Sequence, residues 1–157
     1  MHSRIYQVSK EPIKEFIDEY RYEDNFVGRH ADYVDLVEHE SEDYISDLKW
    51  LQNATKGLEV NLKKGTVKVL SKKDYFEEKH EQFKEYLKKL QDITLADFTS
   101  RKNRFDILDL ESAYNDKYSF YVDDNDEYYG ITTLDDWVRS VEENETYYIG
   151  SIFDYHF

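Results

Sequence analysis

The sequence predicts a single α+β domain, in which an antiparallel sheet of short, hairpin-connected strands is covered by three or four helices. The length of 157 residues suits one domain. Although 36% of the residues are charged, the chain holds 15 Tyr, 9 Phe and 2 Trp and only one Pro, a composition typical of a folded protein. In two places a hairpin pattern leads directly into a capped helix, which favours the α+β class.

The first forty residues predict a strand, a short helix and a turn. Residues 4–8 alternate between polar and apolar side chains and predict the opening strand. Pro12 suits the first position of a helix, and apolar residues recur at helical spacing behind it. Residues 26–28 predict a strand that ends at a glycine, and a further helix is predicted from Asp32.

The next segment contains a capped helix and a hairpin. Ser41 is a good N-cap for a helix that continues to about Ala54. Residues 58–62 and 66–70 both alternate, and the loop between them contains Gly65, so they predict a two-stranded hairpin.

The clearest helix follows this hairpin. Ser71 begins a variant of the capping box, and apolar residues form one stripe from there to Gln91. Residues 92–117 are harder to assign: residues 101–104 indicate a loop, and an apolar group nearby is expected to be buried. This group consists of Phe105, Ile107, Leu108 and Leu110.

The last forty residues predict a second hairpin, a helix and a final strand. Residues 118–122 and 127–131 are the expected strands, with an acidic turn over 123–126 between them. Thr133 is the expected cap of a short helix, and the aromatic and apolar residues of 147–157 predict a strand.

A glycine pattern recurs three times. In residues 26–34, 128–138 and 148–157, an aromatic or apolar pair precedes a glycine, and an aspartate and an aromatic residue follow. The spacing is one residue different in the middle copy, so the sequence leaves open both a pseudo-repeat of strand-Gly-turn units and chance recurrence in a chain rich in Tyr and Asp.

The net charge of −14 narrows the classes of partner. Residues 1–55 carry 6 bases and 13 acids, residues 56–91 carry 10 and 6, and residues 92–157 carry 5 and 16. Such a surface repels nucleic acid and anionic membranes and attracts basic proteins. We therefore expect no membrane association and no direct nucleic-acid binding, even by the lysines of 63–73.

No motif in the sequence indicates a cofactor, a metal or a known catalytic mechanism. The chain has no Cys and only five scattered His, and its five glycines are dispersed. The acidic residues 123–127 do not match an EF-hand, which requires glycine at its sixth position and glutamate at its twelfth. Without a leader pattern or a long apolar segment, a cytoplasmic location is the default expectation.

The remaining feature is an acidic, tyrosine-rich surface in the C-terminal third. Carboxylates accelerate association with a basic partner, and Tyr supplies rigid contact area. The predicted partner-binding residues are Asp123, Asp124, Asp126, Glu127, Tyr128, Tyr129, Glu142, Glu143, Glu145, Tyr147 and Tyr148. The predicted function is occlusion of the basic surface of a nucleic-acid enzyme or toxin.

In size and acidity the chain is similar to DNA-mimicking antirestriction proteins and to bacterial immunity proteins, which implies a bacterial or phage-borne inhibitor. The resemblance is one of composition, so no functional residue is carried over. Two alternatives stay open: a small enzyme with a carboxylate pair in a pocket, and a structural protein that forms a homodimer through residues 151–157.

Overall fold

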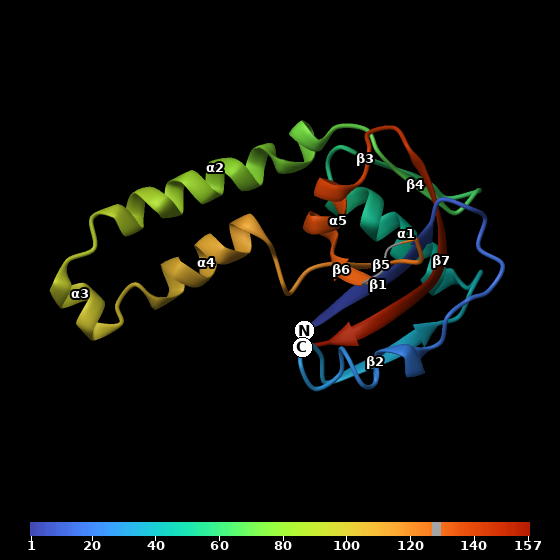
Figure 1. Cartoon of the computed structure of the whole chain (residues 1–157), viewed down its shortest axis with the longest axis horizontal. Coiled ribbons are helices and arrows are strands. Elements are labelled where there is room, and N and C mark those ends of the chain that lie inside the picture. Colours follow the sequence, from blue (N-terminus) through green and yellow to red (C-terminus); the bar gives the residue numbers. More distant parts are fainter. Residues whose placement is uncertain (127–129) are drawn as a thin grey trace.

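The computed structural model describes residues 1–126 and 130–157, which form a mixed α+β domain on a seven-stranded sheet (Figure 1). The strand order is β3-β4-β7-β1-β5-β6, and β2 also pairs with β7. The strands are β1 (His2–Ser9), β2 (Tyr33–Val37), β3 (Leu58–Asn61), β4 (Thr66–Val69), β5 (Tyr121–Asp124), β6 (Ile131–Thr133) and β7 (Thr146–His156). Pairing is antiparallel except between β1 and β5, which are parallel.

Strand β7 is the centre of the sheet. One of its edges pairs with β1 along most of its length, and its other edge is divided between β4 and β2. Ile152, Phe153 and Tyr155 are fully buried. The predicted C-terminal strand is therefore present, and at eleven residues it is long rather than short. Because both edges of residues 152–155 are already paired, this strand is not available as a dimer edge.

A bulge in β7 lies opposite Gln7 of β1. The pairing register shifts between Tyr6 and Val8, opposite Gly150 and Ser151. The buried amide of Gln7 fills this gap, and its Oε1 accepts a hydrogen bond from the backbone N of Ser151 at 2.9 Å. A β-carbon on Gly150 would lie 2.4 Å from that oxygen and 2.7 Å from Ile13 Cδ1, so a larger residue there would force both side chains to move.

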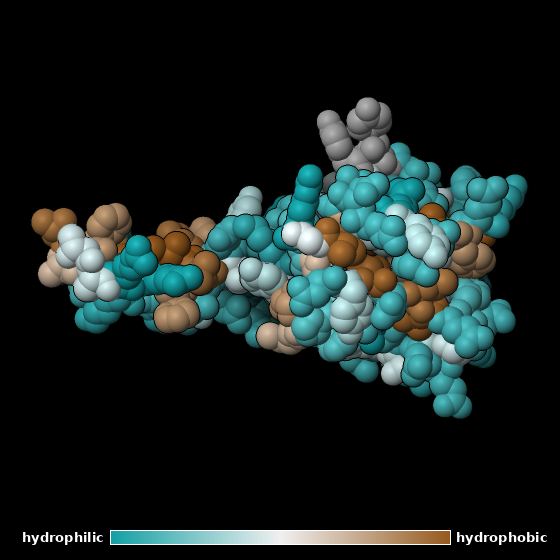
Figure 2. All heavy atoms as spheres, turned by 90° about the horizontal axis from the view of Figure 1, so that it is seen from below, coloured by the Kyte–Doolittle hydropathy of each residue, from teal (hydrophilic) through white to brown (hydrophobic). Residues whose placement is uncertain are grey.

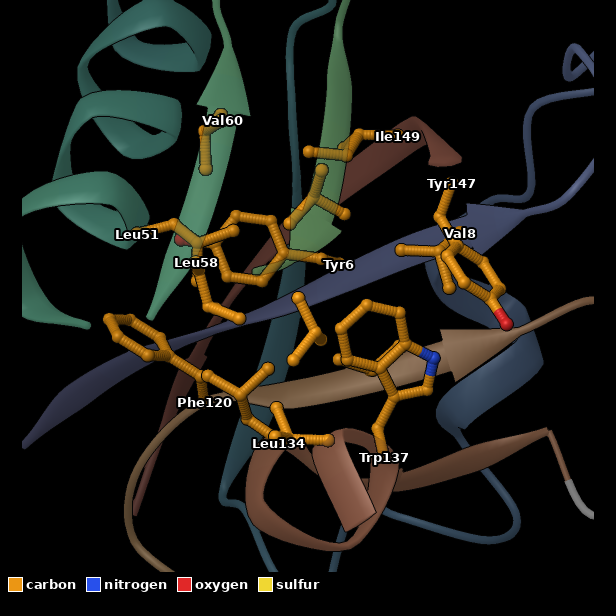
Figure 3. Packing of buried hydrophobic residues seen from close by; sticks show 14 of the residues in the cluster. Tyr6, Val8, Leu51, Leu58, Val60, Phe120, Leu134, Trp137, Tyr147 and Ile149 are labelled. Atoms are coloured by element: carbon orange, nitrogen blue, oxygen red, sulfur yellow. The ribbon is translucent and has the colours of Figure 1, made fainter. Parts of the chain in front are cut away.

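Each face of the sheet has its own core. Helices α1 (Glu42–Ala54) and α5 (Leu134–Ser140) cover one face, where Tyr6, Val8 and Trp137 pack together (Figure 3). On the other face, the segment that includes the short 3-10 helix η1 (Glu19–Tyr22) covers Phe153 and other β7 residues. The sheet is therefore buried on both sides.

The elements with strong local signals are confirmed. The hydroxyl groups of Ser41, Ser71 and Thr133 accept hydrogen bonds from backbone N–H groups three residues later, at the starts of α1, α2 (Lys72–Gln91) and α5. The β3–β4 hairpin is also present, and Gly65 in its loop has a positive φ of 58°.

Three predictions near the N-terminus are wrong. No regular helix follows Pro12; the only helical turn before residue 32 in this described segment is η1. Residues from Asp32 form β2 rather than a helix, because Tyr33–Val37 complete the free half of the β7 edge. The supposed strand at residues 26–28 is a turn with a single bridge from Val27 to Ala31.

The C-terminal hairpin differs in register from the prediction. The strand expected at residues 118–122 is β5, two to three residues later, so Asp123 and Asp124 belong to a strand and not to a turn. The return strand is β6, and part of its predicted range lies at 127–129, outside the described residues. The glycines of the three recurrences of the glycine pattern also differ in conformation. Gly28 and Gly130 have positive φ values of 79° and 63°, whereas Gly150 is inside a strand.

Residues 72–114 form an arm that projects from the sheet (Figure 1). It consists of α2, α3 (Leu95–Ser100) and α4 (Arg104–Tyr114), so the described residues contain five α-helices. The loop expected at 101–104 is shorter, because Arg104 already begins α4. The expected burial of Phe105, Ile107 and Leu108 is wrong: they are 73%, 49% and 45% exposed, since α4 packs mainly against α2 and its outer side stays open.

Candidate protein-binding surface

The acidic turn that was predicted to contact a partner is partly buried. Asp123 is 1% exposed, and its carboxylate accepts hydrogen bonds from Arg21 Nε at 2.7 Å and from the Tyr22 hydroxyl at 2.9 Å. Burial, together with the Asp123 carboxylate, raises the pKa of Tyr22 well above its ordinary value. Asp124 is also buried and accepts a hydrogen bond from Trp137 Nε1 at 3.0 Å. Both carboxylates therefore hold the fold together.

Most of the other predicted acids also have partners within the chain. Asp126 accepts a hydrogen bond from the backbone N of Lys10 at 2.7 Å, and Glu145 lies 3.2 Å from the Lys10 ammonium. Glu143 accepts one from the backbone N of Lys72 at 2.7 Å. These acids are nearer the surface than Asp123, but they are already engaged in internal contacts.

The predicted tyrosine anchors are not gathered on an open surface. Tyr147 is buried, with its ring 5.1 Å from that of Trp137, and Tyr148 is half-buried. Glu142 is exposed. The predicted residues that lie outside the described part of the chain are Glu127, Tyr128 and Tyr129.

A buried carboxylate lies next to an arginine at Asp47. Burial raises the pKa of Asp47, but Arg4 Nε lies 2.7 Å from its carboxylate and acts in the opposite direction. Within residues 1–126 and 130–157, no three His, Asp or Glu side chains converge in a way that could hold a metal ion.

The surface that stands out instead is one face of the arm. Near the sheet, a hollow of about 390 Å³ is lined by Phe76 and Phe83 of α2 and by Tyr114 of α4. At the free end, a larger hollow of about 580 Å³ is lined by Phe98 and Ile107. Figure 2 shows apolar side chains gathered at this free end.

Helical spacing joins these hollows into one surface. Phe83 lies seven residues after Phe76, and Leu87 lies four residues after Phe83, so all three point to the same side of α2. Ile107 and Tyr114, also seven apart, share one side of α4. We call this surface the apolar arm face; its residues are Phe76, Phe83, Leu87, Ile93, Phe98, Ile107, Leu108 and Tyr114.

The other side of the arm is more polar. A hollow of about 210 Å³ on that side is lined by Gln82, Asp109, Ser112 and Asp116, together with Lys79, Tyr86 and Ala113. The arm is therefore a two-helix layer with one apolar and one mainly polar face. An amphipathic layer of this kind normally covers its apolar face with another element.

The root of the arm is firmly attached to the domain. Buried Asp135 accepts hydrogen bonds from the Tyr75 hydroxyl at 2.8 Å, from Lys79 Nζ at 2.9 Å and from the backbone N of Asp116 at 3.0 Å. The Arg139 guanidinium lies 4.5 Å from the centre of the Tyr114 ring. These contacts fix the start of α2 and the end of α4 against α5, so the arm has a defined direction.

Two features of the sequence indicate this surface, although neither by itself predicts that it binds a partner. The apolar stripe of α2 was predicted, but helical spacing does not say whether such a stripe meets a core or a partner. The second feature is the group of apolar residues near Phe105, for which the sequence predicts no neighbouring element. Apolar residues that need burial but have no predicted partner within the chain are also typical of a binding surface.

Comparisons with known proteins give no relatives. No family model matches the chain, and neither a curated protein nor a solved structure is significantly similar to it. In the described ranges, none of the helices has the length and apolar character needed to span a bilayer.

Proposed function

We propose that this protein is a protein-binding module that holds its partner on the apolar arm face. The observation that supports this proposal most directly is the exposure of large apolar side chains along the arm, such as Phe98 at 72%. Contiguous apolar surface of this kind is costly to leave in water, and in stable proteins it marks interaction sites.

The shape of the arm suits the binding of a helix. One hollow lies between α2 and α4, and a second lies between α3 and α4 at the free end, so an amphipathic helix laid along the arm can place side chains at i, i+3/i+4 and i+7 in them. The attachment at Asp135 favours this use, because a preorganised groove loses less entropy on binding. Occlusion of the partner, the mechanism expected from composition, would then act through the arm rather than through the acidic turn.

The test is a comparison of two matched variants. Leu87→Glu places a carboxylate on the apolar arm face, and Gln82→Glu places one on the polar face of the same helix; both original side chains are exposed. Tagged wild type and both variants are used to capture proteins from a lysate of the source organism. We expect wild type and Gln82→Glu to retain the same protein, and Leu87→Glu to lose it.

Both variants should keep the stability of the wild type within about 0.5 kcal/mol, because surface substitutions away from special contacts have small effects. Urea unfolding therefore serves as the control for folding. If folded Leu87→Glu captures the same proteins as Gln82→Glu, the arm face is not the binding surface.

A further inference from the structure

The lining of the apolar hollows is mainly basic, although the protein as a whole is acidic. Residues 72–114 hold 9 bases and 10 acids, whereas the remaining chain holds 12 bases and 25 acids. Six of the nine bases of the arm line the apolar hollows, whereas the polar hollow is lined by Asp109 of α4, by Asp116 just after it and by Lys79. The bases around the apolar hollows are Lys72, Lys79, Lys84, Lys88, Arg101, Arg104 and Arg139. Three of them already pair with acids of this chain: Lys79 with Asp135, Lys84 with Glu81, and Arg139 with Asp136.

The acid among these apolar hollows is already neutralised. Asp97 lies 3.2 Å from Lys102 Nζ and accepts a hydrogen bond from the Thr94 hydroxyl at 2.8 Å. Arg101 and Arg104 are both exposed beside the largest hollow and, among the described residues, have no acidic side chain as a partner. They are available to a ligand.

Resting on the proposed function, we infer that the partner is an acidic amphipathic helix, with an apolar side that fills the hollows and Asp or Glu along its flanks. The apolar hollows would receive the large side chains, and the free guanidinium groups of Arg101 and Arg104 would pair with flanking carboxylates. Arginine is well suited to this role because its planar fork can bind a carboxylate through two hydrogen bonds.

The charge distribution disfavours two other occupants. If two copies packed face to face, the bases around the apolar hollows of one copy would lie against those of the other and repel them. An anionic membrane would attract the bases around the hollows. It would also repel the rest of the chain, which has more than twice as many acids as bases. Because the apolar arm face extends to Phe76, near the sheet, a membrane that covered it would come close to this acidic part.

The inference is tested with two synthetic amphipathic peptides of the same length as α2. Both carry Leu at i, i+3/i+4 and i+7; one has Glu at the flanking positions and the other has Lys. Binding of each labelled peptide to the full-length protein is measured by fluorescence anisotropy at low and high salt. We expect the Glu peptide to bind, and to bind more weakly at high salt than at low salt. The Lys peptide should bind at least tenfold more weakly than the Glu peptide at low salt, which is the order expected for the loss of two exposed ion pairs.

Charge-reversal variants locate the effect. The double variant Arg101→Glu/Arg104→Glu should weaken binding of the Glu peptide about tenfold. The matched control Lys63→Glu/Lys64→Glu makes the same charge change in the exposed β3–β4 loop, away from the arm, and should leave binding unchanged. An equal effect of both double variants would mean that net charge, rather than the bases around the hollows, selects the peptide.

The other results separate this inference from the proposed function. If the Lys peptide binds as tightly as the Glu peptide, and Leu87→Glu weakens both, the arm binds helices but the acidic class is wrong. If neither peptide binds, the inference is also wrong, and the capture experiment decides whether the proposed function fails with it. Arm-dependent dimerisation of the purified chain in sedimentation, or arm-dependent binding to phosphatidylserine vesicles, would overturn the inference in favour of those occupants.

Discussion

The attachment of the arm depends on one buried carboxylate, so we expect Asp135→Ala to be strongly destabilising. The substitution removes the acceptor for Tyr75, Lys79 and the backbone N of Asp116 at once. Burial, with Asp135 beside it, raises the pKa of Tyr75 well above its ordinary value, so this hydroxyl stays protonated and needs an acceptor.

The size of the effect follows from these three contacts. Losing one partner of a buried charged group costs about 3–5 kcal/mol, and a buried donor without an acceptor costs about 1–3 kcal/mol. Because the Lys79 side chain is 28% exposed and can turn toward water, the loss of its partner costs less than for a fully buried group. The expected decrease in the free energy of unfolding is therefore near the lower end of this range, at about 3 kcal/mol. Asp135→Asn keeps one acceptor oxygen and should lose less.

Urea unfolding followed by circular dichroism measures the loss, and hydrogen exchange of the α2 amides reports whether the root of the arm has loosened. Glu77→Ala is the control, because Glu77 is an exposed carboxylate on the same helix. We expect faster exchange in the first turns of α2 for Asp135→Ala only. A loss below about 1 kcal/mol, or unchanged exchange, would refute the role assigned to this carboxylate.

Two further predictions concern the core. Burial raises the pKa of Tyr44 to about 12 in the folded protein. Above pH ~10 the unfolded chain therefore loses the Tyr44 hydroxyl proton before the folded protein does. The contribution of this group to the free energy of unfolding should then fall by up to about 1.4 kcal/mol per pH unit. In urea titrations between pH ~9 and ~12, Tyr44→Phe should show a shallower fall, and an unchanged slope would contradict this. Gly150→Ala should cost about 1–3 kcal/mol, because its β-carbon would lie 2.4 Å from Gln7 Oε1. Adding Gln7→Ala should weaken the penalty of the glycine substitution; a fully additive double variant would show that the close contact with Gln7 is not the cause.

The structure changes the interpretation of acidity in this protein. Composition alone suggested that the acids near Asp123 face a basic partner, but that carboxylate is used inside the fold by Arg21, which is far away in sequence. The surface that we propose for the partner is on the arm, where the apolar hollows are lined mainly by bases. A strongly negative total charge therefore does not set the charge of each part of the surface.

Some parts of the fold followed from the sequence because their signals are local. A cap such as Ser71 satisfies an N–H only three residues away, and the β3–β4 hairpin needs only its own alternation and Gly65. These interactions form within one short segment, so the sequence of that segment was enough to predict them. The α+β class followed from them.

Tertiary structure alone decided the rest. Tyr33–Val37 is a strand because β7, more than a hundred residues later, offers it an unpaired edge. The apolar side chains of the arm are exposed because α4 packs mainly against α2, although their helical spacing would suit a core equally well. Caps and turns depend on a few neighbouring residues, whereas burial depends on which distant segments come together, and this is what created the candidate site.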